Sequence, residues 1–146
     1  MEDLIRSGKV VLKEYLGVKE GEAILIVVDS PLKRIGEALL EAGKEFGSQA
    51  TLMEMLPRKS SGEEPPSVVS QAMLAADIIV LATSKSLSHT RARKEANLKG
   101  ARVASMPGIT EEAMVRTLEK IDRNLVERAK KYTGLLNQGE EVHLTT

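Results

Sequence analysis

Short apolar runs alternate along this chain with segments whose apolar residues recur at helical spacing. The run Ala23–Val28 is continuously apolar and rich in β-branched residues, which is typical of a strand buried on both faces of a parallel sheet. Asp77–Ala82 repeats this pattern after an acidic first residue. Further strands are predicted over Ala50–Leu56, Arg102–Met106 and Val142–Thr146.

Helices are predicted between these strands. The apolar residues from Leu4 to Leu16 recur at helical spacing, and Gly17 ends that run. Ser30 followed by Pro31 predicts an N-cap and a first helical residue, with a helix running to about Phe46. The other predicted helices are Val68–Ala75, one that follows residues 86–90, one capped by Thr110, and Leu118–Leu136.

Strands that alternate with helices specify an α/β fold. We predict one domain over residues 1–146, a three-layer, doubly wound and mainly parallel sheet with helices on both faces, of the flavodoxin or Rossmann-like kind. The segment PRKSSGEEPP at 57–66 is polar and bounded by prolines, so it is expected to be a surface loop.

Composition narrows the function classes. Lys plus Arg and Asp plus Glu both count 21, so no net charge holds the chain on nucleic acid or on a membrane. Three aromatic residues, Tyr15, Phe46 and Tyr132, give almost no surface for stacking bases. The absence of Cys excludes thiol catalysis and thiolate zinc sites, and with no signal-like or membrane-spanning run it leads us to expect a cytoplasmic protein.

The segment SLSHTRARKEA at 86–96 holds the densest candidate chemistry. Hydroxyls and free N–H groups near a helix N-terminus suit a carboxylate or phosphate, and an adjacent Arg adds a charge-assisted hydrogen bond. The alternative is an ordinary helix capped by Ser86 or Ser88, whose cations face water; the residues alone favour it, since such caps are common and anion sites are not. The candidate substrate- or anion-binding residues are Ser84, Ser86, Ser88, His89, Thr90, Arg91 and Arg93.

Other chemistries find little support. A catalytic His89 lacks an identifiable orienting group and oxyanion hole, so no catalytic residue is predicted. No metal site is predicted either, because the second histidine, His143, is distant in sequence and the pairs Glu63-Glu64 and Glu140-Glu141 are expected to be solvated. No glycine-rich phosphate loop follows the first strand, where Asp29 is interpreted as part of a capping turn.

Three segments together resemble a known family: EEPP at 63–66, AADIIVLATSKSLSHTRARKEANLKGARVASMPGIT at 75–110, and the final VHLTT. They look like the N-terminal half of the thermophilic leucyl aminopeptidase (aminopeptidase T) metallopeptidases, a group that includes proteins similar to a dihydroxypyridine ring-cleaving dioxygenase. The resemblance spans essentially the whole chain and is weaker before residue 60.

The resemblance implies that this chain is the N-terminal, non-metal-binding half of a longer two-domain protein. Its catalytic partner domain is expected to lie beyond Thr146 and to hold a divalent metal, zinc, cobalt or manganese, that serves in removing N-terminal residues from peptides. The chain alone is expected to be inactive and to self-associate through the face that the other domain would cover. The alternatives are a stand-alone α/β ligand-binding or interaction module, and the N-terminal domain of a ring-cleaving dioxygenase.

Overall fold

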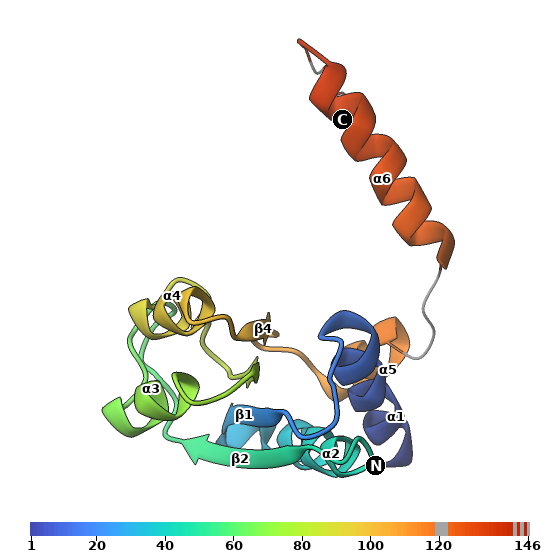
Figure 1. Cartoon of the computed structure of the whole chain (residues 1–146). Helices are drawn as coiled ribbons and strands as arrows, with labels where there is room; N and C mark the ends of the chain where they lie inside the picture. Colours follow the sequence, from blue (N-terminus) through green and yellow to red (C-terminus); the bar gives the residue numbers. More distant parts are fainter. Residues whose placement is uncertain (119–122, 142, 144, 146) are drawn as a thin grey trace.

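The computed structural model describes residues 1–118, 123–141, 143 and 145, and its centre is a parallel sheet (Figure 1). The sheet has the order β2-β1-β3-β4 within the described residues. All three neighbouring pairs are parallel. The strands are β1 (Ala23–Asp29), β2 (Gln49–Met55), β3 (Ile78–Ala82) and β4 (Arg102–Ser105).

Helices connect the strands and cover both faces of the sheet (Figure 1). The first helix begins as a regular α-helix and widens into a π-helix over its last five residues, closed by the N–H of Leu16 on the carbonyl of Val11 at 3.0 Å. The helices are α1 (Glu2–Val10), the π-helix η1 (Val11–Tyr15), the 3-10 helix η2 (Ser30–Leu32), α2 (Lys33–Lys44), α3 (Ser67–Met73), α4 (Arg91–Leu98), α5 (Glu111–Leu118) and α6 (Arg123–Gln138).

The sheet separates two apolar cores. Alternate residues of β1 and β3 point to opposite faces, as the pleat requires. Ile24, Ile26 and Val80 pack with α1, η1, α2 and α5 on one face. Val27 and Leu81 pack with α3 and α4 on the other. The continuous apolar runs of β1 and β3 therefore follow from burial on both faces, and the predicted three-layer α/β fold is confirmed.

Helix α2 lies unusually close to the sheet. A Cβ atom on Gly36 would stand 2.5 Å from Cγ1 of Val28 and 2.9 Å from Cδ1 of Leu52. Such distances are shorter than any van der Waals contact, so a glycine at this position is a packing requirement. This close approach fixes the start of α2 directly beside the carboxyl end of β1.

Most elements lie where the sequence predicts them, within one or two residues. The predicted cap at Ser30 is wrong, since Ser30 and Pro31 lie inside a 3-10 turn that Asp29 precedes without a side-chain cap. The strand expected over Val142–Thr146 falls mostly outside the described residues, as does the start of the helix expected over Leu118–Leu136.

Helix α6 points away from the sheet and exposes its apolar residues (Figure 1). Its largest exposed side chains are Leu125, Val126, Tyr132, Leu135 and Leu136. Glu14 and Tyr15 of η1 line a pocket together with Leu125 and Val126, but all five of these α6 side chains remain more than half exposed.

Within the part of the chain that the structure describes, every helix is too short or too polar to span a lipid bilayer.

Candidate functional site

The carboxyl edge of the sheet carries the candidate site. The chain leaves β1 toward α2 and β2 on one side, whereas the connections from β3 lead to β4 on the other side. Strand order therefore reverses between β1 and β3, and ligands of open α/β sheets bind outside the strands at such a point. Asp29 ends β1, and Thr83 and Ser84 directly follow β3.

Asp29 and Ser84 form a buried polar pair at this reversal. Oδ2 of Asp29 accepts the backbone N–H of Ser84 at 2.8 Å and its hydroxyl at 2.5 Å. Asp29 is fully buried, and its second oxygen, Oδ1, has no hydrogen-bond partner among the described residues. Asp29 occupies the N-cap position of the 3-10 helix η2, as a residue of a capping turn would, but its carboxylate makes no capping bond there and bonds to Ser84 instead.

A pocket of about 410 Å3 opens beside Ser84. Ser84 forms part of its wall, and the starts of α2 and α5 form the remainder. Leu32, Ile35 and Ile109 supply apolar surface, while Arg34 and Glu111 pair with each other at 3.6 Å. Thr110, which also lines the pocket, accepts the N–H of Ala113 at 3.1 Å and so caps α5, as the sequence predicts.

The two serines that follow Ser84 in the loop, Ser86 and Ser88, bond to each other and to Ser105 of β4. The hydroxyl of Ser86 donates to Ser88 at 3.0 Å, and the hydroxyls of Ser88 and Ser105 lie 2.8 Å apart. Ser86 also accepts the backbone N–H of Ser88 at 3.2 Å. This chain of hydroxyls fixes the loop between β3 and α4 against the end of β4.

Thr90, rather than Ser86 or Ser88, caps α4. Its hydroxyl oxygen accepts the N–H of Arg93 at 3.3 Å and donates to the carbonyl of Leu87 at 2.7 Å. The guanidinium of Arg93 turns back onto the loop, donating to the carbonyl of Ser88 at 2.7 Å and to Oδ1 of Asn97 at 2.9 Å. The alternative of a cap at Ser86 or Ser88 is therefore wrong, because Thr90 caps α4.

The first N–H groups of α4 are occupied by a carboxylate from the chain itself. Glu64 accepts the N–H of Arg91 at 2.5 Å through Oε1 and that of Ala92 at 3.2 Å through Oε2. These two N–H groups are the donors that an external anion would use, and the carboxylate of Glu64 already accepts hydrogen bonds from both. Glu64 is exposed, as expected, and caps α4 as well. The anion-binding role of residues 84–93 stays a prediction.

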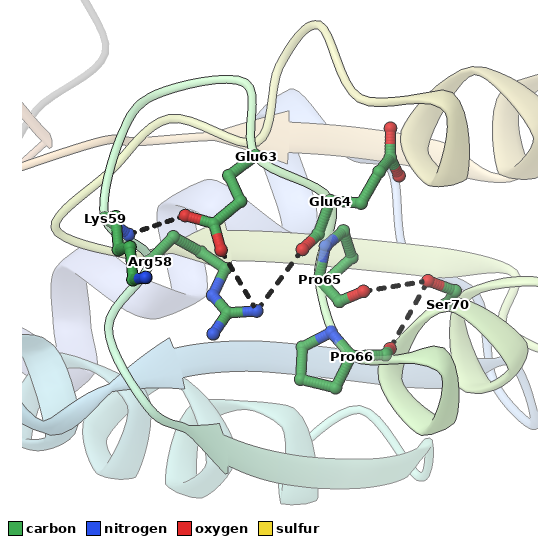
Figure 2. Close-up of polar contacts among 7 residues, drawn as sticks. All are labelled: Arg58, Lys59, Glu63, Glu64, Pro65, Pro66 and Ser70. Carbon is green, nitrogen blue, oxygen red and sulfur yellow. Dashed lines mark hydrogen bonds and ion pairs between the residues drawn. The ribbon is translucent and has the colours of Figure 1, made fainter.

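Contacts within the loop 57–66 hold Glu64 next to the N-terminus of α4. Figure 2 shows Glu63 turned toward Arg58 and Lys59, while the carboxylate of Glu64 points away from them. Glu63 accepts the N–H of Lys59 at 2.7 Å and lies 3.7 Å from the Arg58 guanidinium. The N–H of Lys59, with the charge of Arg58, holds the pKa of Glu63 below its usual value despite partial desolvation.

Two further hydrogen bonds hold this loop against the β3–α4 loop. The N–H of Gly62 donates to the carbonyl of Ser86 at 2.8 Å, and the N–H of Ser86 donates to the hydroxyl of Ser61 at 3.2 Å. Gly62 has a φ of 86°, a left-handed conformation that glycine adopts without strain. The two loops therefore form one unit at the edge of the sheet.

The remaining candidates face solvent. His89 is exposed, and no partner bonds to it in the described part of the chain. The side chain of Arg91 is 84% exposed and lies 3.4 Å from Glu95. His143 pairs instead with Glu141 at 3.2 Å. Across the described ranges, no group of three or more His, Cys, Asp or Glu residues could hold a metal ion.

Sequence reasoning thus missed two acidic residues, Asp29 and Glu64. Asp29 carries a detectable signal, since an acidic residue at the carboxyl end of a central strand lies where strand order reverses. Glu64 carries none, because its partners lie 27 and 28 residues along the chain and belong to no local capping pattern.

Comparison with known proteins supports the fold. No protein-family model and no curated protein matches the chain. The structure of 2,5-dihydroxypyridine dioxygenase from Pseudomonas putida KT2440 matches with a TM-score of 0.65 and 18% identity, over 79% of this chain and 36% of that chain. Wild-type AmpT from Thermus thermophilus matches with a TM-score of 0.47 and 14% identity, over 80% of this chain and 41% of that chain. This chain therefore spans less than half the length of either protein.

Proposed function

We propose that this chain is the N-terminal α/β domain of a longer, metal-dependent exopeptidase similar to the leucyl aminopeptidases of the aminopeptidase T family. The observation that carries the proposal is the position of residues 84–93. This segment holds most of the SLSHTRARKEA motif on which the resemblance rests, and it follows β3 at the carboxyl edge of the sheet. Ligands of open α/β sheets bind at this edge.

In this proposal the chain orients substrate and supplies no metal ligand. The described residues do not fit a divalent cation, since they contain no cluster of ligating side chains. Zinc, cobalt or manganese in a second domain would activate water and polarise the scissile carbonyl. The exposed His89 and Arg91 remain available to a peptide or to that second domain, whereas Ser86, Ser88, Thr90 and Arg93 hold the loop that presents them.

A second candidate is the corresponding domain of a ring-cleaving dioxygenase. One specific observation favours it, the TM-score of 0.65 with the Pseudomonas putida dioxygenase over 79% of this chain. An α/β domain of this kind suits both enzymes, because the reaction is decided by residues of the metal site. A stand-alone ligand-binding module is the third outcome that an experiment must separate from these two.

The coding sequence around these 146 residues provides the first test. A reading frame that continues into a second domain with a set of His, Glu and Asp residues able to bind a metal supports either enzyme. A stop codon after Thr146 supports the stand-alone module. The protein from the complete frame is then loaded with zinc, cobalt, manganese or ferrous iron and assayed. Release of the chromophore from a leucyl chromogenic substrate supports the exopeptidase. Oxygen-dependent loss of 2,5-dihydroxypyridine, with no leucyl hydrolysis, contradicts it in favour of the dioxygenase.

A further inference from the structure

We propose that helix α6 of one copy of this chain binds the groove between α1 and α5 of a second copy, and that the two copies exchange their α6 helices reciprocally. The proposal goes beyond the proposed function, because α6 (Arg123–Gln138) contains none of residues 84–93. It identifies the two surfaces through which the expected self-association takes place.

The apolar stripe of α6 is the surface that needs a partner. Leu125, Val126, Tyr132 and Leu136 fall within about 120° of the helix circumference, and each is between 52% and 61% exposed. A pocket of about 800 Å3 lies between this helix and η1. An amphipathic helix of 16 residues is only marginally stable in water without tertiary packing, so α6 gains stability when another surface covers the stripe.

The charges beside the stripe select the partner. Arg128 and Lys130 flank it, each about 100° from Ala129 at its centre. In paired helices the residues that flank the apolar seam decide which partners associate. Two α6 stripes packed on each other would bring the cations of both copies to one seam, which is unfavourable. An apolar surface bordered by carboxylates is therefore the better match.

A surface of this kind lies between α1 and α5, where a groove of about 480 Å3 opens. Its apolar residues are Met1, Leu4 and Val115, of which Met1 is half exposed. Its charged residues are Asp3, Glu111, Glu112 and Arg116, so carboxylates outnumber cations. The groove therefore combines apolar surface with a negative border, the complement of the α6 stripe.

Glu112 is the carboxylate of this groove that is left for a partner. Asp3 and Glu111 already pair with arginines of their own chain, at 3.4 and 3.6 Å. Glu112 is exposed, and among the described residues it makes no ion pair. On α6, Arg128 already interacts within its own chain. Lys130 is therefore the cation that we expect Glu112 of the second copy to receive.

The area of the contact suits a stable dimer. The five large apolar side chains of α6 expose roughly 600 Å2, and a reciprocal exchange covers this area twice, which reaches the range of about 1,200–2,000 Å2 found for specific interfaces. The groove surface adds to this total. A reciprocal exchange also closes on itself with two-fold symmetry, so it leaves no free stripe to recruit further copies.

Sedimentation equilibrium of the purified 146-residue chain provides the first test. We expect a dimer of twice 15.9 kDa with a micromolar dissociation constant. Leu125→Gln removes apolar surface from the stripe but keeps a good helix former, so the chain should fold and dimerise less well. Far-UV circular dichroism checks that the variants retain their folded structure.

Charge reversal tests the orientation of the contact. We expect Lys130→Glu to weaken dimerisation by about tenfold, because it replaces attraction with repulsion at both contacts of the dimer. Lys131→Glu is the matched control, since it makes the same change one residue further on, at the face of α6 opposite the stripe. It should dimerise like the wild type. Glu112→Lys should weaken dimerisation as Lys130→Glu does.

Mixing the two charge-reversed chains separates exchange between copies from contacts within one copy. Lys130→Glu and Glu112→Lys should each be mainly monomeric at a concentration where the wild type is a dimer. An equimolar mixture should dimerise again, because every contact of the mixed dimer joins one cation and one carboxylate.

Three results would overturn the proposal. The first is a wild-type chain that stays monomeric throughout the micromolar range, which would leave α6 to its own chain or to a different partner, such as a second domain. The second is unchanged dimerisation in Leu125→Gln, or equal effects of Lys130→Glu and Lys131→Glu. The third is a mixture of Lys130→Glu and Glu112→Lys chains that remains monomeric.

Discussion

The carboxylate of Glu64 binds the N-terminus of α4 through the backbone N–H of Arg91, at 2.5 Å, as an external anion would. It bonds to the N–H of Ala92 as well, at 3.2 Å. The positive end of the helix dipole and two unsatisfied donors favour a negative charge there. The loop 57–66 therefore stabilises α4, the helix of the SLSHTRARKEA motif.

Removing this carboxylate should destabilise the chain. We expect Glu64→Ala to lower the free energy of unfolding by about 1 kcal/mol, the usual effect of losing a helix cap. Urea denaturation measures it. Glu140→Ala is the control, because it removes the same charge from an exposed residue beyond α6 and should leave the midpoint unchanged. Equal effects of the two substitutions would show that Glu64 acts only through its charge on the whole molecule.

The same variant tests the predicted anion site. If Glu64 occupies the donors of α4, sulfate should shift the amide signals of Arg91 and Ala92 in Glu64→Ala at concentrations that leave the wild-type signals in place. The reason is competition, because the wild-type carboxylate is held at high local concentration by its loop. Equal responses in both proteins would contradict the account, and silence in both would favour the capping interpretation of the motif.

Close packing of α2 on the sheet gives a prediction about stability. Gly36→Ala would place a Cβ atom 2.5 Å from Val28, and we expect it to lower the free energy of unfolding by about 1–3 kcal/mol. Gly134→Ala is the matched control, since Gly134 also lies in a helix but has open space around its Cα. It should be neutral or stabilise α6 by up to about 1 kcal/mol. Thermal unfolding of both variants distinguishes packing from helix propensity.

An ion pair at the opposite edge of the sheet predicts a pH dependence. Desolvation alone would raise the pKa of Glu22, but the N–H of Lys19 and the guanidinium of Arg102 outweigh it and hold the pKa below its usual value. Glu22 lies 2.5 Å from Arg102 and accepts the Lys19 N–H at 2.8 Å. Because the folded pKa is lower than the unfolded one, its stabilising contribution is complete above the unfolded value of 4.5 and is lost as the pH falls through the folded value.

The variant Glu22→Gln isolates that contribution. Between about pH 7 and about pH 3, the wild type should lose more unfolding free energy than the variant, by no more than about 1 kcal/mol for a partly exposed pair. Denaturant titrations at the two pH values give the difference. Parallel losses in wild type and variant would show that the Glu22–Arg102 pair does not contribute to folding.

Local patterns in the sequence account for most of the fold. Continuous apolar runs predict β1 and β3, because strands buried on both faces leave no polar position. Gly17 ends the first helical segment with a φ of 58°, and Thr110 caps α5, so the expected turn and cap chemistry is found. These features depend on neighbouring residues and can be recognised without knowing the tertiary structure.

The site was less predictable because its bonds join distant segments. Ser84 depends on Asp29, and α4 begins on Glu64, at separations of 55 and 27 residues. Local propensity instead favours Ser86 or Ser88 as the cap, whereas the loop geometry gives this role to Thr90 and leaves the serines to bond with one another. The composition of residues 86–96 marks them as a candidate site, but their partners Glu64 and Ser105 come from distant segments that only the tertiary structure brings together.

The central claim is that residues 84–93, at the carboxyl edge of the sheet, orient substrate, and that this chain binds no catalytic metal of its own. The most direct test incubates the purified 146-residue chain with zinc, cobalt or manganese, removes free metal by desalting, and measures bound metal together with hydrolysis of a leucyl chromogenic substrate. We predict neither stoichiometric metal nor turnover, since catalytic metal sites need three or more protein ligands around an open position. Stoichiometric metal with turnover that disappears in His89→Ala would contradict this account.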